Sequence, residues 1–145
     1  MTDQRGYDPE AEGTIMDQLA GRIELSLPSE SRYMRLARLM ASGVATTCGL
    51  PLEEVEDFRI AVDEVCATLI EIGDAEPVRL AFELGSQTLV VTATTVASRE
   101  AAIDEERLGL SRQILDVVTD GHELSQSGGE ATFTARKQVR SRGVG

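Results

Sequence analysis

The pattern of hydrophobic and polar residues predicts two kinds of element along this chain of 145 residues. Apolar residues at every second position predict half-buried strands at 22–27, 78–84, 88–95 and 130–137. Pro28 ends the first strand. Glycine-containing turns at 85–87 and 127–129 predict two β-hairpins, with 121–126 as the partner of the last strand.

Steps of three and four between apolar residues predict three helices. The first follows a capping serine, Ser29 or Ser31, and ends at Gly49. The second, over 51–72, is the strongest helical pattern in the chain and begins with a proline and two acidic residues. After a polar and irregular stretch at 96–106, four apolar residues mark the third helix: Leu110, Ile114, Val117 and Val118.

The order of these elements is strand, helix, helix, hairpin, helix, hairpin, and it predicts the fold class. Because helices must bury their apolar stripes on the sheet, we expect an α+β fold, a two-layer α/β sandwich. Its mixed, mostly antiparallel sheet has about five strands and is covered on one face by three helices. We expect one domain over 21–138, between flexible tails at 1–20 and 139–145.

Charge and composition narrow the classes of function. The net charge is −11, and an acidic surface repels nucleic-acid phosphates, so we expect no direct nucleic-acid binding. Such a surface suits a protein partner with a basic face, or serves solubility alone. No stretch approaches the roughly 20 apolar residues of a membrane helix, and the acidic N-terminus lacks a secretion signal, so we expect a cytoplasmic protein. Two cysteines and one histidine form no metal-binding cluster.

Residues that could carry chemistry gather on the predicted helix 51–72. One face of that helix is formed by Asp57, Ala61, Glu64, Thr68 and Glu71. Glu64 and Thr68 are four residues apart, so their side chains point into the same space. A carboxylate beside a hydroxyl can hold a metal ion or orient a hydroxyl nucleophile. The alternative is the solvated face of a surface helix.

The stretch at 56–70, EDFRIAVDEVCATLI, resembles the N-box helix of the anti-sigma regulatory factors, RsbW/SpoIIAB-like serine/threonine protein kinases with the GHKL (Bergerat, histidine-kinase-like) ATPase fold. The family pattern is roughly E-D-x-x-x-A-V-x-E-x-x-x-N-A. A later Gly-Leu followed by a helix, then an acidic residue, Gly-Gly and a strand ending in T-x-x-K, extend the resemblance over about residues 22–137. The segment 61–70 is similar to a degenerate actinobacterial subset of the family.

The resemblance implies roles for three residues. Glu64 stands at the catalytic base, which orients the hydroxyl to be phosphorylated. Thr68 replaces the Asn that coordinates the magnesium of ATP, and Gly109 remains from the glycine-rich box that cradles phosphates. The Asp-x-Gly-x-Gly motif that reads adenine is missing from 92–98, which reads TATTVAS. ATP and magnesium are the family's cofactors, but these departures lead us to expect no bound cofactor and no resident metal.

Three functional hypotheses follow. The first is an anti-sigma factor that sequesters an alternative sigma factor of the sigma-B or sigma-F type and is countered by a STAS-domain anti-anti-sigma protein. The second is an active ATP-dependent kinase that phosphorylates that partner, and the third is an unrelated α/β domain with a small ligand. The resemblance implies a homodimer and a partner surface on the first helix, at Arg32, Arg35 and Arg38. A solvated basic face is the alternative for these arginines.

Overall fold

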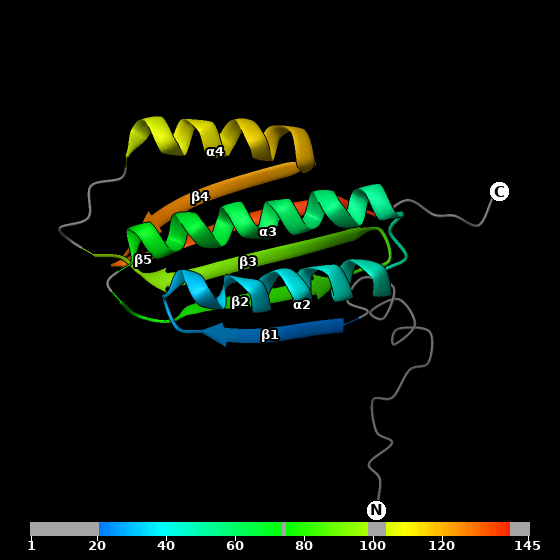
Figure 1. The fold of residues 1–145 in the computed structure, drawn as a ribbon, viewed down its shortest axis with the longest axis horizontal. Coiled ribbons are helices and arrows are strands. Elements are labelled where there is room, and N and C mark those ends of the chain that lie inside the picture. The colour runs from blue at the N-terminus through cyan, green and yellow to red at the C-terminus, as the bar shows by residue number, and fades with distance from the viewer. Residues whose placement is uncertain (1–20, 74, 99–103, 140–145) are drawn as a thin grey trace, which may run out of the picture.

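The computed structural model describes residues 21–73, 75–98 and 104–139, which form one sheet and one layer of helices (Figure 1). The elements are β1 (Gly21–Leu27), the 3-10 helix η1 (Ser31–Tyr33), α2 (Met34–Thr47), α3 (Leu52–Ile72), β2 (Val78–Leu84), β3 (Thr88–Val96), α4 (Glu105–Val118), β4 (Gly121–Ser127) and β5 (Glu130–Gln138). The predicted two-layer α+β sandwich is confirmed. The tails predicted at 1–20 and 139–145 lie outside the described residues except for Val139, whose N–H binds the Gln87 carbonyl at 2.7 Å.

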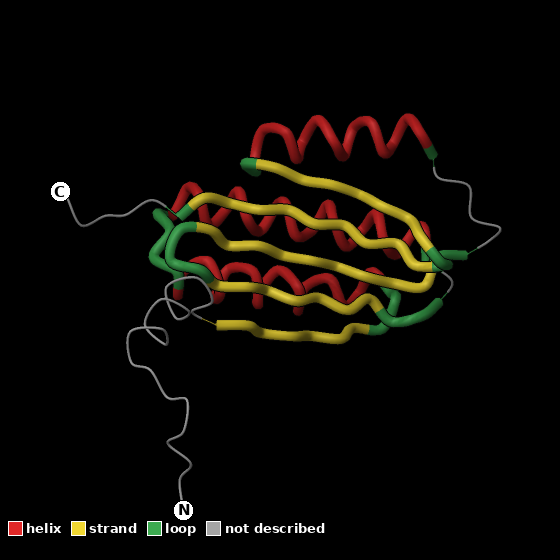
Figure 2. Tube along the Cα trace, turned by 180° about the vertical axis from the view of Figure 1, so that it is seen from behind, coloured by secondary structure: helices red, strands yellow, loops and turns green. Residues whose placement is uncertain are grey.

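The sheet has five strands in the order β1-β2-β3-β5-β4, and each of its four pairings is antiparallel. All three helices lie on one face, and Figure 2 shows the sheet from the other side with the helices behind it. The helix α3 lies between α2 and α4, as expected for the 51–72 helix. No helix among the described residues is long and apolar enough to cross a membrane.

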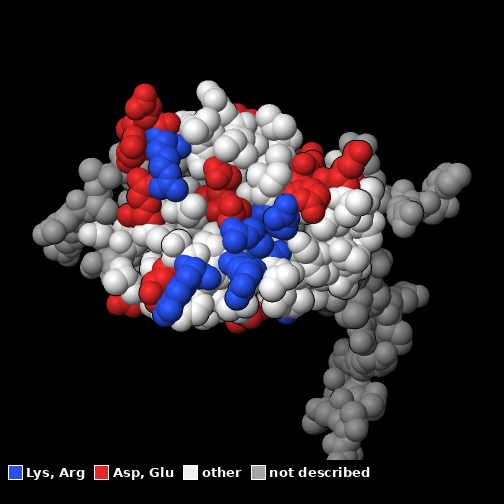
Figure 3. Space-filling model, in the orientation of Figure 1, with Lys and Arg blue, Asp and Glu red and all other residues white. Residues whose placement is uncertain are grey.

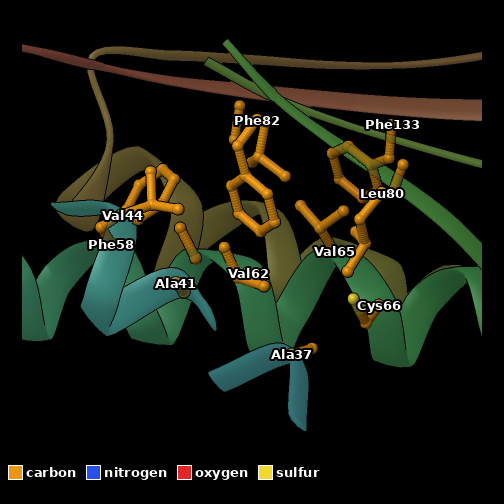
Figure 4. Close-up of a cluster of buried hydrophobic side chains, with 14 of the residues drawn as sticks. Ala37, Ala41, Val44, Phe58, Val62, Val65, Cys66, Leu80, Phe82 and Phe133 are labelled. Atoms are coloured by element: carbon orange, nitrogen blue, oxygen red, sulfur yellow. The ribbon is translucent and has the colours of Figure 1, made fainter. Parts of the chain in front are cut away.

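The core lies between α3 and the middle of the sheet. Fully buried Val62 and Val65 of α3 face Phe82 of β2 and Phe133 of β5 (Figure 4). The ring of Phe58 packs edge-on against Phe82, with 6.2 Å between ring centroids. Each such side chain contributes roughly 1.5–3 kcal/mol on burial. Since α3 carries most of these contacts, its position in the fold is the most strongly determined.

The two ends of α2 differ in how well the sequence predicts them. Gly49 ends the helix at φ +82°, with its N–H bonded to the Thr46 carbonyl and the Leu50 N–H bonded to the Ala45 carbonyl, a Schellman motif. The predicted cap by Ser29 or Ser31 is wrong. The chain enters α2 through η1, whose backbone bonds replace a side-chain cap, and Tyr33 occupies the cap position.

The helix α4 begins earlier than predicted and faces the core with a different stripe. Its inward residues are Leu108, Ser111, Leu115 and Val118. Leu110 and Val117, predicted as core, are 59 % and 80 % exposed. Both sets of residues have helical spacing, so the spacing alone does not determine which set faces the core. The neighbouring surface of α3 determines it, because Glu64 there accepts a hydrogen bond from buried Ser111.

Candidate functional site

The predicted functional face of α3 lies against α4. On this face Ala61 and Thr68 are buried, while Asp57, Glu64 and Glu71 are half-buried. The face is therefore partly covered and is not the freely solvated helix face that was one of the two alternatives from the sequence. Its chemistry depends on the contacts that α4 makes with it.

Glu64, the predicted catalytic base, accepts a hydrogen bond from a hydroxyl group of the chain itself. Its Oε1 accepts a hydrogen bond from Ser111 Oγ at 3.0 Å. Ser111 is buried on the inward side of α4. The 47 positions that separate the two residues hide this contact from any local motif. The geometry is one in which a carboxylate orients a hydroxyl.

Thr68 stands where the family has the magnesium-coordinating Asn, and its hydroxyl makes a hydrogen bond within α3. Its Oγ1 donates to the backbone carbonyl of Glu64 at 2.9 Å. The cavity beside it, which Glu71, Asp104 and Arg107 also line, leaves about 10 Å³ for water. That volume is about the minimum for one water molecule, whereas small-ligand sites usually measure several hundred Å³.

The N-terminus of α4 is occupied by the chain's own carboxylate. Asp104 Oδ1 accepts the N–H groups of Glu106 and Arg107 at 3.1 and 3.3 Å. Such N–H groups are the usual binding site for phosphate at a helix start. Arg107 pairs with Glu71 of α3, which ties this turn to the candidate site. The sequence analysis missed these contacts, although an aspartate followed by two glutamates is a helix-start signal.

Gly109 lies apart from the other two predicted nucleotide residues. It lines a hollow on the outer side of α4, together with Leu110 and Gln113. The residues that line the cavity at Thr68 do not include Gly109. The structure therefore brings Glu64 and Thr68 together and leaves Gly109 on the outside.

The end of β3 is the position where the family has the Asp that binds adenine. In this chain, hydrogen bonds connect that segment to neighbouring elements. Buried Thr95 donates to the Pro77 carbonyl at 3.1 Å. The N–H of Ser98 binds the Ile72 carbonyl at 3.0 Å, and the N–H of Ala97 binds the Gly129 carbonyl at 2.8 Å. This segment is thus joined to the end of α3 and to the β4–β5 turn.

A buried lysine at the opposite end of α3 received no role from the sequence. Lys137 Nζ lies 3.4 Å from Asp57 Oδ2 and 3.8 Å from Glu54 Oε1, and donates to the Val118 carbonyl at 3.3 Å. It links β5 to the start of α3 and the end of α4. The sequence signal for its burial was its place in the alternation of β5: Lys137 lies an even number of positions from Phe133, so both point to the inward face.

The three predicted partner-binding arginines differ in how they are held. Arg38 pairs with Asp63 of α3 at 2.7 Å, and Arg32 stacks on the Tyr33 ring at 4.9 Å. Arg35 is exposed, and within the described part of the chain it makes no hydrogen bond or ion pair. Figure 3 shows Lys and Arg side chains gathered over α2 and α3, with acidic side chains on both sides.

The two cysteines offer no reactive thiol to this site. Burial, and then the charge of Asp63, raise the pKa of Cys66 to about 12. Burial also raises the pKa of Cys48. Both behave as small apolar side chains, because the thiol form persists at neutral pH.

Comparison with known proteins gives matches to one family and one fold. The model of the histidine kinase-like ATPase domain matches residues 27–129. The serine-protein kinase RsbW of Bacillus pumilus is 38% identical over 56 residues, 39% of this chain and 35% of that protein. The Bacillus cereus (strain B4264) protein of the same name is 28% identical over 75 residues, 50% of this chain and 47% of that protein.

The chain thus spans about a third to a half of the length of these curated relatives. Among solved structures, the SiaB-SiaC complex from Pseudomonas aeruginosa has a similar fold, with a TM-score of 0.57 and 13% identity. That alignment covers 93% of this chain and 100% of the other chain.

Proposed function

Because the chain belongs to the histidine kinase-like ATPase domain family, we propose that it is an anti-sigma factor that acts by binding protein. It sequesters an alternative sigma factor of the sigma-B or sigma-F type, in the cytoplasm, as part of a stress response. A STAS-domain anti-anti-sigma protein counters it by competing for the chain. The similarity to serine-protein kinases named RsbW supports this assignment. Membership in the family excludes the hypothesis of an unrelated α/β domain.

The observation that carries the proposal is that the chain fills its own nucleotide face. Ser111 donates a hydrogen bond to the carboxylate of Glu64, and Asp104 caps the N-terminus of α4. Arg107 forms an ion pair with Glu71. The resemblance gives Glu64 the role of catalytic base, and N–H groups at a helix start are donors of the kind that bind phosphate. Moving α4 away from α3 would break the Ser111–Glu64 and Arg107–Glu71 contacts, whereas the Asp104 cap belongs to α4 and would move with it. The residues present therefore do not fit ATP and magnesium in this conformation.

The alternative function is an active serine/threonine kinase that phosphorylates its anti-anti-sigma partner. The observation in its favour is the hydrogen bond from Ser111 Oγ to Glu64, since a base that orients a substrate hydroxyl makes the same contact. In this alternative Glu64 is the catalytic base and Thr68 contacts the magnesium. Gly109, which lies on the outer side of α4, would contact the phosphates only after a movement of α4. It requires that Ser111 leave Glu64 when substrate arrives.

The partner surface we propose is the outer side of η1 and α2, at Arg32, Arg35 and Arg38. Arg35 is the strongest candidate anchor, because the other two are held by neighbours. Exposed Leu36 and Leu39 lie beside it on the same helix. Arginine next to apolar area is a common composition for an interface anchor. We also propose a homodimer, for which the sheet face that no described element covers offers room (Figure 2).

A thermal-shift measurement with ATP and magnesium separates the two functions. At a ligand concentration of about 100 times Kd, a working site would stabilise the chain by about 2.7 kcal/mol. For a chain of this size that corresponds to roughly 5–10 °C in Tm. We expect a shift under about 1 °C at millimolar nucleotide. A shift in the larger range would make the kinase the better assignment.

A titration against the sigma factor tests the partner surface. Glu64→Ala removes the predicted base and leaves α2 unchanged, so its affinity should equal that of the unaltered chain. Reversing charge at Arg35 and Arg38 should weaken binding by about 2 kcal/mol or more, which is about 30-fold in Kd. Circular dichroism must first show that both variants are folded. If Glu64→Ala abolishes binding and the arginine reversals do nothing, the α2 surface is not the interface.

A further inference from the structure

The outer face of α4 carries apolar side chains that the fold does not use. Leu110 is 59 % exposed and Val117 is 80 % exposed. With Glu106 and Gln113 they follow one another at steps of four, three and four, so the four residues form one line along the helix. The side of α4 that packs on the described part of the molecule is the opposite one.

Gly109 lies beside this line, and the fold gives no reason for a glycine there. A Cβ at this position would meet no atom within 4 Å. Glycine inside a helix lowers its stability relative to alanine, but it lets another backbone approach closely. Gly109, Leu110 and Gln113 line a shallow, open hollow on this side of α4, whose lining residues all belong to α4 and to Asp104 just before it. The glycine favours a close-packed second element.

Charge defines what can occupy the hollow. Asp104, Glu105 and Glu106 line its end at the start of α4, and Arg107, the one cation among the lining residues, is already paired with Glu71. Figure 3 shows acidic side chains around a basic group at this end of the helical face. Three carboxylates repel a phosphate, which argues against a nucleotide. A line with two exposed apolar side chains and an acidic end is complementary to an amphipathic helix with basic side chains.

We propose that this α4 face, formed by Glu105, Glu106, Gly109, Leu110, Gln113 and Val117, docks a basic amphipathic helix of the sigma factor. The proposal rests on the proposed sigma-binding function. A protein that binds DNA carries such helices, because their cations contact phosphates. The α4 face and the arginines of α2 lie on opposite sides of α3 (Figure 1). Two separate segments of the sigma factor can therefore be held at once.

The test compares matched substitutions on two helices. Leu110→Lys with Val117→Lys places cations opposite a basic helix, and Leu52→Lys is the control, because Leu52 is 77 % exposed at the start of α3. Each chain is titrated by biolayer interferometry against the purified alternative sigma factors of the same organism. We expect the α4 variant to bind at least about tenfold more weakly and the control to stay within about twofold.

Salt dependence gives a second readout. Replacing Glu105 and Glu106 with glutamine should slow association at low salt and flatten its dependence on ionic strength, because the acidic end attracts the basic helix. Unchanged association in that variant would contradict the charge argument. Circular dichroism checks folding, and if the double lysine variant unfolds, Val117→Lys alone replaces it with the same expected direction.

The outcomes separate this inference from the function on which it rests. If the α4 variant binds as the unaltered chain does while Arg35→Glu fails to bind, the α4 inference is overturned and the anti-sigma function stands. If the unaltered chain binds no sigma factor, both are overturned. Loss of binding in the Leu52→Lys control as well would also overturn it, because the effect would then be general to added surface charge.

Discussion

The contact between Ser111 and Glu64 can be tested with a double-mutant cycle on stability. The variants are Ser111→Ala, Glu64→Ala and the two together. The contact joins a buried hydroxyl to a half-buried carboxylate at 3.0 Å. If α4 rests on α3 in solution as it does in the structure, the two substitutions must be coupled, because each removes the same hydrogen bond.

The magnitude follows from the burial of the two partners. A hydrogen bond to a charged group contributes about 1.5–3 kcal/mol, and water recovers part of the loss where it reaches the freed carboxylate. We expect Ser111→Ala to cost about 1–2 kcal/mol, with a coupling energy of the same size. For this chain length such a loss lowers Tm by roughly 3–6 °C.

The assay is urea unfolding followed by circular dichroism for all four chains. Thr68→Val is the matched control, because it removes a different hydroxyl bond on the same face, from Thr68 to the Glu64 backbone carbonyl. Its coupling to Ser111→Ala should stay under about 0.5 kcal/mol. If the Ser111–Glu64 coupling is equally small, α4 does not rest on the carboxylate in solution. The nucleotide face would then be open, and the reasoning about a self-filled site would fail.

Three further predictions concern other buried groups. Replacing Glu54 and Asp57 with the matching amides should lower the free energy of unfolding in urea by about 3 kcal/mol, because it leaves the buried ammonium of Lys137 without a counter-charge. Lys137→Met should lower it by less than about 1 kcal/mol, since the two carboxylates that lose their partner are partly exposed. With a pKa of about 12, Cys66 should resist a disulfide reagent at neutral pH and react once urea unfolds the chain, as thiol counting will show. Gly73→Ala should lower the unfolding free energy by about 1–3 kcal/mol, since its Cβ would lie 3.0 Å from a backbone oxygen of α3.

Much of the fold could be predicted because its periodic patterns are long. The helix α3 places apolar residues at helical spacing over 21 positions, and the two hairpins combine alternation with short turns. The helix α4 was harder, because a serine stands at the centre of its buried side. Ser111 is buried because Glu64 binds it, and a contact between residues so far apart in sequence leaves no local pattern.

The candidate site was predictable only where a motif on one helix defines it. Glu64 and Thr68 lie together as their spacing requires. The groups that fill the space around them come from other elements, at Asp104, Arg107 and Ser111. Their roles depend on how α4 is rotated about its axis, which packing against the whole helical layer determines. For the same reason the sequence assigned Leu110 to the core, where the structure exposes it.

The proposed function requires that the chain bind its sigma factor without a nucleotide. The most direct measurement is calorimetric titration of the purified sigma factor into the nucleotide-free chain, repeated with millimolar ATP and magnesium. We expect the same dissociation constant in both titrations, within about twofold, because contacts between α4 and α3 keep the nucleotide face filled. Binding that appears only when ATP and magnesium are present would contradict it, and would show that the nucleotide face is a working site.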